Sequence, residues 1–260
     1  MPTLIFYLNG IFLSKNNINY FEIFTLITIS AFAYVINQIT DIETDKINNK
    51  ILILPQNKIS IKLALKFSIF LFILSIFLSI LSEKKFYFFT LIILSMLYSL
   101  KPFSFKDKAF LDLLTNAIGY GFVVFSIGYG SISKESLIFT LIMACAYIMT
   151  AILDYEGDKK VNKNTTVVYL GIYTSQIMSI IGLLIVFFIS QYTYIKMSAF
   201  ISLIFLALNE IKLALAIASF ILLIYPSING YIEILIICIV LFLISELYYR
   251  LVFKRSHFSL

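Results

Sequence analysis

Long uninterrupted hydrophobic stretches, separated by short polar segments, dominate the chain. Most stretches approach the about 20 residues that an α-helix needs to cross a hydrocarbon core, and they lack the alternation of barrel strands. Because backbone groups in lipid must be bonded internally, each stretch predicts a transmembrane helix. Helices are expected at 2–13, 20–40, 61–82, 86–100, 109–131, 135–153, 167–189, 192–208, 210–226 and 230–250. The first is too short to cross alone, so we expect an all-α polytopic transmembrane bundle of nine or ten helices.

The composition also predicts a lipid environment. Of the 260 residues, 61% are hydrophobic and 13% are charged, whereas soluble domains carry about 25% charged residues. No soluble fold of this length could bury so much apolar surface. We therefore interpret residues 1–260 as a single transmembrane domain with membrane lipids around it. The net charge of +6 lies in short loops, so nucleic acid is not an expected partner.

The lysines are distributed unevenly between the two sets of loops. The loops at 41–60, 101–108 and 154–166 would lie on one face, and four lysines occupy the opposite loops: Lys15, Lys84, Lys85 and Lys134. The first set contains nine: Lys46, Lys50, Lys58, Lys101, Lys106, Lys108, Lys159, Lys160 and Lys163. Because positive loops stay inside, we expect a multi-pass protein of the cell membrane with the first set in the cytoplasm.

Two acidic segments, Asp41-Ile-Glu-Thr-Asp45 and Asp154-Tyr-Glu-Gly-Asp158, each follow an apolar stretch on that face. Residues four apart share one side of a helix, and Asn37 extends the first row. Like charges placed this way repel, and a divalent cation would relieve the repulsion. Mg²⁺ prefers oxygen ligands and bridges carboxylates to phosphates, so two facing clusters could grip a diphosphate. The simpler alternative is solvated loop acids balanced by neighbouring lysines.

Three segments carry a family resemblance. The run from Asn37 through Asp45 to Asn48 resembles the first aspartate-rich motif of the UbiA superfamily of intramembrane prenyltransferases, and Asp154 to Asp158 resembles the second. The segment Tyr98-Ser-Leu-Lys101-Pro-Phe-Ser-Phe-Lys106 resembles the basic loop between them. The chain departs from the family pattern at Gln38 and at Ile-Leu-Pro55, where an Arg-Pro is frequent. The missing Arg-Pro favours branches other than the quinone, haem and ether-lipid enzymes.

The resemblance implies a helical bundle around a central cavity that opens laterally to lipid. It implies catalytic roles for Asp41, Asp45, Asp154 and Asp158, which would bind Mg²⁺ together with Asn37. It also implies contacts to the diphosphate by a further set: Asn37, Lys101, Lys106, Lys159 and Lys163. The function so implied is transfer of a polyprenyl group from its diphosphate to a lipophilic acceptor, such as a quinone precursor, a prenylated glycerol phosphate or a carotenoid.

Such chemistry suits these residues. Breaking an allylic C–O bond leaves negative charge on the diphosphate, which metal ions and lysines stabilise. It also leaves an allylic cation, which an apolar cavity shields from water. The alternative is a secondary transporter, or another membrane protein, that uses the acids to bind cations. Transporter sites lie near the bilayer midplane. Here the acids fall at helix ends, which disfavours that alternative.

Overall fold

The computed structural model describes residues 2–48 and 50–254. Within these residues, ten helices of 13 residues or more form the bundle. They are α1 (Pro2–Ser14), α2 (Tyr20–Thr40), α4 (Ile61–Leu81), α5 (Lys85–Ser99), the continuous α6–η2–α7 (Leu111–Asn116, Ala117–Val123, Val124–Tyr129), α8 (Lys134–Lys160), α10 (Ile172–Ile189), α11 (Thr193–Ala207), α12 (Ile211–Ile228) and α13 (Ile232–Phe253). Short elements are α3 (Ile42–Ile47), η1 (Phe105–Asp107) and α9 (Thr166–Leu170). With no strand among the described residues, the all-α prediction is confirmed.

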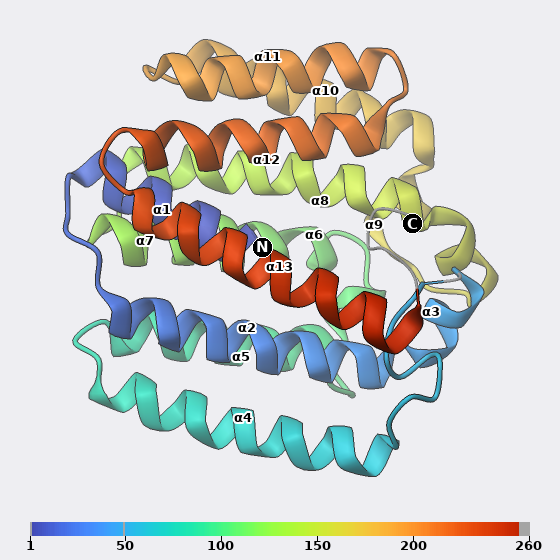
Figure 1. Cartoon of the computed structure of the whole chain (residues 1–260). Helices are drawn as coiled ribbons and strands as arrows, with labels where there is room; N and C mark the ends of the chain where they lie inside the picture. The colour runs from blue at the N-terminus through green and yellow to red at the C-terminus, as the bar shows by residue number, and fades with distance from the viewer. Residues whose placement is uncertain (1, 49, 255–260) are drawn as a thin grey trace.

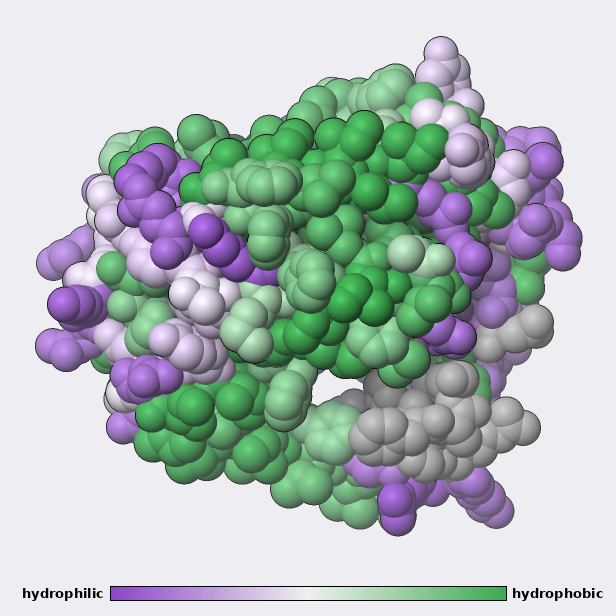
Figure 2. Space-filling view, turned by 90° about the horizontal axis from the view of Figure 1, so that it is seen from above, coloured by the Kyte–Doolittle hydropathy of each residue, from purple (hydrophilic) through white to green (hydrophobic). Residues whose placement is uncertain are grey.

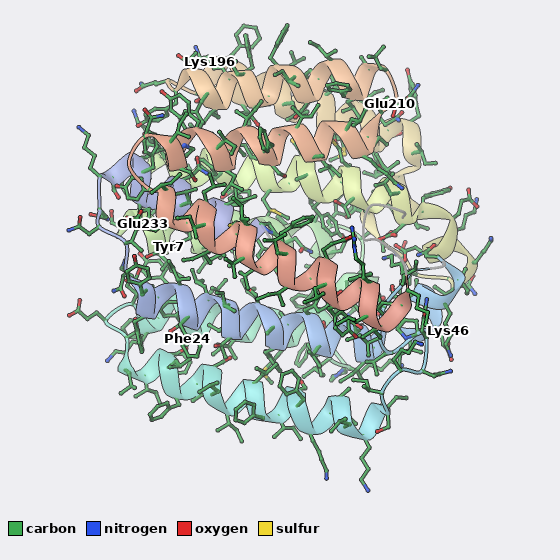
Figure 3. All side chains as sticks on the ribbon, viewed as in Figure 1. Tyr7, Phe24, Lys46, Lys196, Glu210 and Glu233 are labelled. Carbon is green, nitrogen blue, oxygen red and sulfur yellow. The ribbon has the colours of Figure 1, made fainter. Side chains whose placement is uncertain are left out.

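The bundle has the surface of a multi-pass membrane protein. Seven helices within the described chain are long and apolar enough to cross a bilayer, and α1, α5 and α11 are shorter apolar helices. Seen from above, hydrophobic side chains form a broad central band and hydrophilic ones gather at both ends (Figure 2). Lys46 and Glu210 lie at one end, and Lys196 and Glu233 at the other (Figure 3). The band therefore corresponds to the lipid-facing surface.

The helices lie side by side, with α4, α2 and α5 on one side, α1 and α7 in the middle, and α8, α12, α10 and α11 on the other (Figure 1). Short α1 packs closely against α7 because glycines face each other. A Cβ at Gly10 would collide with the backbone of Phe125, and one at Gly128 with the backbone of Tyr7. Such small-residue contacts are the usual means of close helix approach in membranes.

A buried polar cluster ties α1 to the far side of the bundle. The side-chain amide of Asn9 donates to the carbonyl oxygens of Ile5 and Leu222 at 2.8 and 2.9 Å. Its Oδ1 accepts a 2.8 Å bond from the hydroxyl of Tyr194. Asn9 is fully buried, and the cluster joins α1 to α11 and α12. These bonds satisfy every polar atom of an amide that lipid could not solvate.

Two predicted helix boundaries are wrong. The helix expected at 135–153 continues as α8 to Lys160, where two terminal lysines complement the negative end of the helix dipole. The helix expected at 167–189 is divided at Gly171, whose φ of 82° ends α9 before α10 begins. Only glycine adopts that conformation readily. The second acidic segment consequently lies within a helix.

Candidate active site

One cavity of about 700 Å³ is lined by residues from α1, α2, α3, α5, α6–η2–α7 and α8. Its inner wall includes apolar side chains such as Ile29, Leu91 and Met143. Pro2, Tyr34 and Thr150 also line it, and all three are exposed. Because Tyr34 and Thr150 belong to membrane-spanning segments, the cavity opens sideways toward lipid between α2 and α8. This agrees with the predicted cavity and lateral opening.

The first acidic segment lies at one end of this cavity. Asp41 leaves helical geometry (φ −111°, ψ 12°) and separates α2 from α3. Even so, the Asp41 N–H bonds to the Asn37 carbonyl at 2.9 Å and the Asp45 N–H to the Asp41 carbonyl at 2.8 Å. The four-residue spacing of a helix therefore persists through the break, and all three side chains line the cavity.

The second acidic segment occupies the last two turns of α8. Asp154 and Asp158 are one turn apart and both line the cavity. Glu156 between them is exposed and lies outside the cavity lining, as does Glu43 in the first segment. Residues two apart on a helix face different directions, which explains the difference. Each segment thus contributes its two aspartates and turns its glutamate outward.

A contact between Asn48 and Gly157 brings the two segments together. Asn48 ends α3, and its side chain occupies the space where a Cβ at Gly157 would stand. Lys50 follows in the same loop, and its Nζ lies 3.5 Å from Asp45 and 2.9 Å from Asp154. The next residue is held by α13, because the Tyr249 hydroxyl donates to the Ile51 carbonyl at 2.9 Å. The loop after α3 therefore closes one side of the site.

Two further lysines close the other side. Lys106, which is almost fully buried, lies 2.8 Å from Asp41 and donates to Thr40 Oγ1 at 2.6 Å. Lys163 lies 2.7 Å from Asp41 and 3.8 Å from Asp158. Each of the four aspartates is thus within ion-pair distance of a lysine. No three acidic, histidine or cysteine side chains in the described chain form a ready-made metal site.

Burial and charge act on these carboxylates in opposite directions. Burial alone would raise the pKa of Asp41, but the ammonium groups of Lys106 and Lys163 outweigh it and hold that pKa below its ordinary value. For Asp45, burial raises the pKa, and the Lys50 ion pair opposes this without cancelling it. The charge of Asp41 raises it further. Four aspartates outnumber three lysines, so the site favours additional positive charge.

The structure brings only some of the predicted lysines to the cavity. Lys101 and Lys159 are both exposed and lie outside the cavity lining, so the structure does not support their expected contacts to a diphosphate. Lys159 instead donates to the Tyr155 hydroxyl at 3.4 Å. Lys106 and Lys163 do line the cavity. Lys50 was overlooked, although its place shortly after the first segment could have indicated it.

A second polar group lies beside the cavity, where Tyr147 and Asn116 belong to the lining and Asp112 does not. The carboxylate of Asp112 is fully buried at the start of α6. It accepts a 2.9 Å bond from the Tyr147 hydroxyl and bonds of 2.8 Å from the N–H groups of Leu113 and Thr166. The Thr166 hydroxyl also donates to it. Asp112 thereby connects α6, α8 and the segment after Lys163.

The chain matches the family model of the UbiA prenyltransferase family over residues 3–228. It belongs to that family. The match ends with α12, so α13 lies outside it. The predicted enzyme class, an intramembrane prenyltransferase, is confirmed by this membership, and the transporter alternative is not supported.

Relatives and solved structures agree with the family assignment. The chain is 34% identical over 210 residues to digeranylgeranylglyceryl phosphate synthase of Sulfolobus acidocaldarius, covering 76% of this chain and 70% of that protein. It is 30% identical over 204 residues to the enzyme of the same name from Saccharolobus solfataricus, covering 74% and 67%. A UbiA homologue from Archaeoglobus fulgidus bound to DMAPP and Mg²⁺ has a TM-score of 0.67 at 20% identity, covering 87% and 92%. The UbiA fold is thus common to this chain and that structure.

Proposed function

We propose that this chain transfers a polyprenyl group from a polyprenyl diphosphate to a prenylated glycerol phosphate, in a reaction that needs Mg²⁺. The observation that carries the proposal is the convergence of Asp41, Asp45, Asp154 and Asp158 with three lysines at one end of an apolar cavity. The names of both archaeal relatives favour a glycerol phosphate acceptor. We give these names more weight than the missing Arg-Pro after the first acidic segment, which favours branches other than the ether-lipid enzymes.

The side chains at the charged end suit Mg²⁺. The five predicted ligands there all offer carboxylate or amide oxygens, which are ligand types that Mg²⁺ prefers. Burial raises the pKa of Asp45 and the charge of Asp41 raises it further, and a bound cation would oppose both effects. Asn37, Asp41, Asp45, Asp154 and Asp158 would hold the ion, and it would neutralise charge on the leaving diphosphate.

The lysines would exchange partners when substrate binds. Lys106 and Lys163 both pair with Asp41. A diphosphate beside them would take over these hydrogen bonds and release Asp41 for the metal. Lys50 would do the same from the α3 side, releasing Asp45 and Asp154. The three ammonium groups then stabilise the charge that develops as the C–O bond breaks.

The rest of the cavity would hold the isoprenoid chains. Its apolar wall keeps water from the allylic cation, so that the acceptor rather than water reacts. The opening between α2 and α8 gives lipid substrates a route from the bilayer. The charged end thus stabilises the leaving diphosphate, and the apolar cavity protects the allylic cation until the acceptor reacts.

We further propose that the chain lies in the cell membrane with the charged end facing the cytoplasm. The loops expected to be cytoplasmic lie at the same end of the bundle as α3 (Figure 1), and they contain the larger share of the lysines. A Lys159→Cys variant should react with an impermeant thiol reagent only when the cytoplasmic side is accessible. Labelling of intact cells would reject this orientation.

The proposed reaction can be tested in lipid nanodiscs. Purified protein with Mg²⁺, labelled geranylgeranyl diphosphate and a prenylated glycerol phosphate should release diphosphate and form a labelled ether lipid. Asp41→Asn and Asp154→Asn should abolish the product, because each removes a charge that holds the metal. Product formation in excess chelator would reject the metal requirement.

The two acidic segments supply their own matched controls. Glu43→Gln and Glu156→Gln remove the same charge from the same segments, but both side chains are exposed and outside the cavity lining. They should retain nearly full activity. Equal losses in the glutamate and aspartate variants would show that general surface charge, rather than this site, matters.

A further inference from the structure

Asp112 is a buried charge that the diphosphate site does not use. Its carboxylate has no exposed surface, and no lysine or arginine in the described part of the chain lies within ion-pair distance. A buried carboxylate without a cation is costly even when it is hydrogen-bonded. A neutral side chain could hold the same loop at a lower cost in folding free energy. The charge of Asp112 is therefore better explained by a role in the chemistry than by a structural role.

The bonds around Asp112 fix the direction of the Tyr147 hydroxyl. The N–H groups of Leu113 and Thr166 can only donate, so Asp112 accepts from them. Tyr147 donates its phenolic proton to Oδ2 at 2.9 Å. Since Tyr147 also lines the cavity, the lone pairs of its oxygen are left for a donor on the cavity side.

Tyr98 extends this polar group toward the charged end. It lines the cavity from α5, and its hydroxyl interacts with the side chains of Tyr147 and Asn116. Tyr98 and Tyr147 therefore line the same cavity as the diphosphate site, and the Tyr147 bond links that cavity to Asp112.

We propose that Tyr98 and Tyr147 receive the reacting hydroxyl of the acceptor and pass its proton to Asp112. This inference rests on the proposed function. The acceptor oxygen forms a bond to the allylic carbon, and the diphosphate leaves with the electron pair of the broken C–O bond. The acceptor proton moves to a tyrosine oxygen as the Tyr147 proton moves to Asp112, so the carboxylate ends protonated and both phenols are neutral.

The direction of this transfer is favourable. An alcohol that has attacked an allylic cation becomes a protonated ether, which is a strong acid. Its proton will pass even to a carboxylate stabilised by several donors. The aspartates of the charged end are poor alternatives, because metal and diphosphate would occupy them. Tyr98 and Tyr147 are therefore catalytic residues in this proposal, and Asp112 acts through Tyr147.

Tyr147→Phe is the decisive variant, because it removes one hydroxyl and leaves the bonds of Asp112 to Leu113 and Thr166. Transfer should slow by about 100-fold or more, the usual range for losing a proton acceptor. The residual rate should rise with pH as hydroxide takes over, a rise that the unaltered protein lacks. Affinity for Mg²⁺ and an unreactive geranylgeranyl thiodiphosphate should stay within about twofold. Tyr155→Phe, on the same helix but outside the cavity lining, should behave as the unaltered protein.

Two results would overturn the inference. Unchanged transfer in Tyr147→Phe would mean that the diphosphate itself takes the proton. Weakened thiodiphosphate binding with no new pH dependence would mean that Asp112 and Tyr147 only hold the segment that carries Lys163. In both cases Asp41→Asn would still be inactive, so the proposed function would stand. Absence of any transfer by the unaltered protein would instead reject the proposed function.

Discussion

The side chain of Asn48 lies directly against Gly157, at the point where α3 reaches the last turns of α8. Only glycine leaves room for it there, and the contact brings Asp45 and Asp154 within reach of the single ammonium group of Lys50. The two acidic segments can therefore lie this close together because Gly157 has no side chain.

Gly157→Ala should separate the two segments. The new methyl group would occupy the position of the Asn48 amide, so that side chain and the end of α3 that carries it must shift away from α8. We expect prenyl transfer to fall at least about tenfold, since small displacements of positioning groups cost that much or more. Alanine favours a helix by about 1 kcal/mol over glycine, so α8 itself should not be weakened. Kinetic assays and a denaturation curve would separate the two effects.

The control for this prediction is a second substitution. Asn48→Ala removes the atoms that collide, so the double variant with Gly157→Ala should recover most of the lost activity. Asn48→Ala alone should cost little, because its side-chain nitrogen is buried without a hydrogen-bond partner in the described structure. A double variant no better than Gly157→Ala would contradict this account.

Lys50→Met should weaken diphosphate binding more than Lys159→Met does. Lys50 pairs with Asp45 and Asp154 inside the cavity, whereas Lys159 is exposed beside Tyr155. Losing a hydrogen bond to a charged group costs about 1.5–3 kcal/mol, or roughly 10-fold to 100-fold in affinity. Titration with geranylgeranyl thiodiphosphate would measure both variants. Equal losses of affinity in the two variants would contradict the assignment of Lys50, rather than Lys159, to the diphosphate site.

Mg²⁺ and the diphosphate should bind cooperatively. Each carboxylate is paired with a lysine, so a metal ion alone would leave lysines without an anion, and a diphosphate alone would leave aspartates without a cation. In thermal denaturation, Mg²⁺ with the thiodiphosphate should raise Tm well above the sum of the separate shifts. If Mg²⁺ alone raised Tm as much as Mg²⁺ and the thiodiphosphate together, the lysines would not be blocking the metal ligands.

Tyr194→Phe should lower stability without touching the site. It removes the bond to Asn9 Oδ1 and leaves a buried amide oxygen without a partner. The expected loss in the free energy of unfolding is about 1–2 kcal/mol. Unfolding in detergent would measure it, and Tyr173→Phe, an exposed tyrosine on α10, serves as the control. Equal losses of unfolding free energy in the two variants would show that the Asn9 cluster does not stabilise the bundle.

Much of the bundle follows from sequence because lipid imposes a simple rule. An apolar run must be helical, so the expected helices agree with the structure to within a few residues at most ends. The aspartates of each segment were predicted to share a helix face for a similar local reason. Gly171 could have been recognised as a break, but a single glycine within an apolar run is also common inside membrane helices.

The lysines and Asp112 were harder because their roles depend on contacts between distant segments. Nothing local distinguishes Lys106, almost fully buried, from Lys101 five positions earlier, which is exposed. Asp112 sits between apolar neighbours with no motif around it. Its partners Tyr147 and Thr166 lie 35 and 54 residues away. Only the folded bundle brings them together.

The sideways opening between α2 and α8 changes what substrate concentration means for this protein. Lipids that enter from the bilayer are encountered by diffusion in two dimensions, so their supply depends on mole fraction in the leaflet and not on amount per volume of water. Diluting both lipids with inert phospholipid at fixed total quantity should slow turnover. Turnover can therefore be controlled by how crowded the surrounding membrane is with isoprenoids.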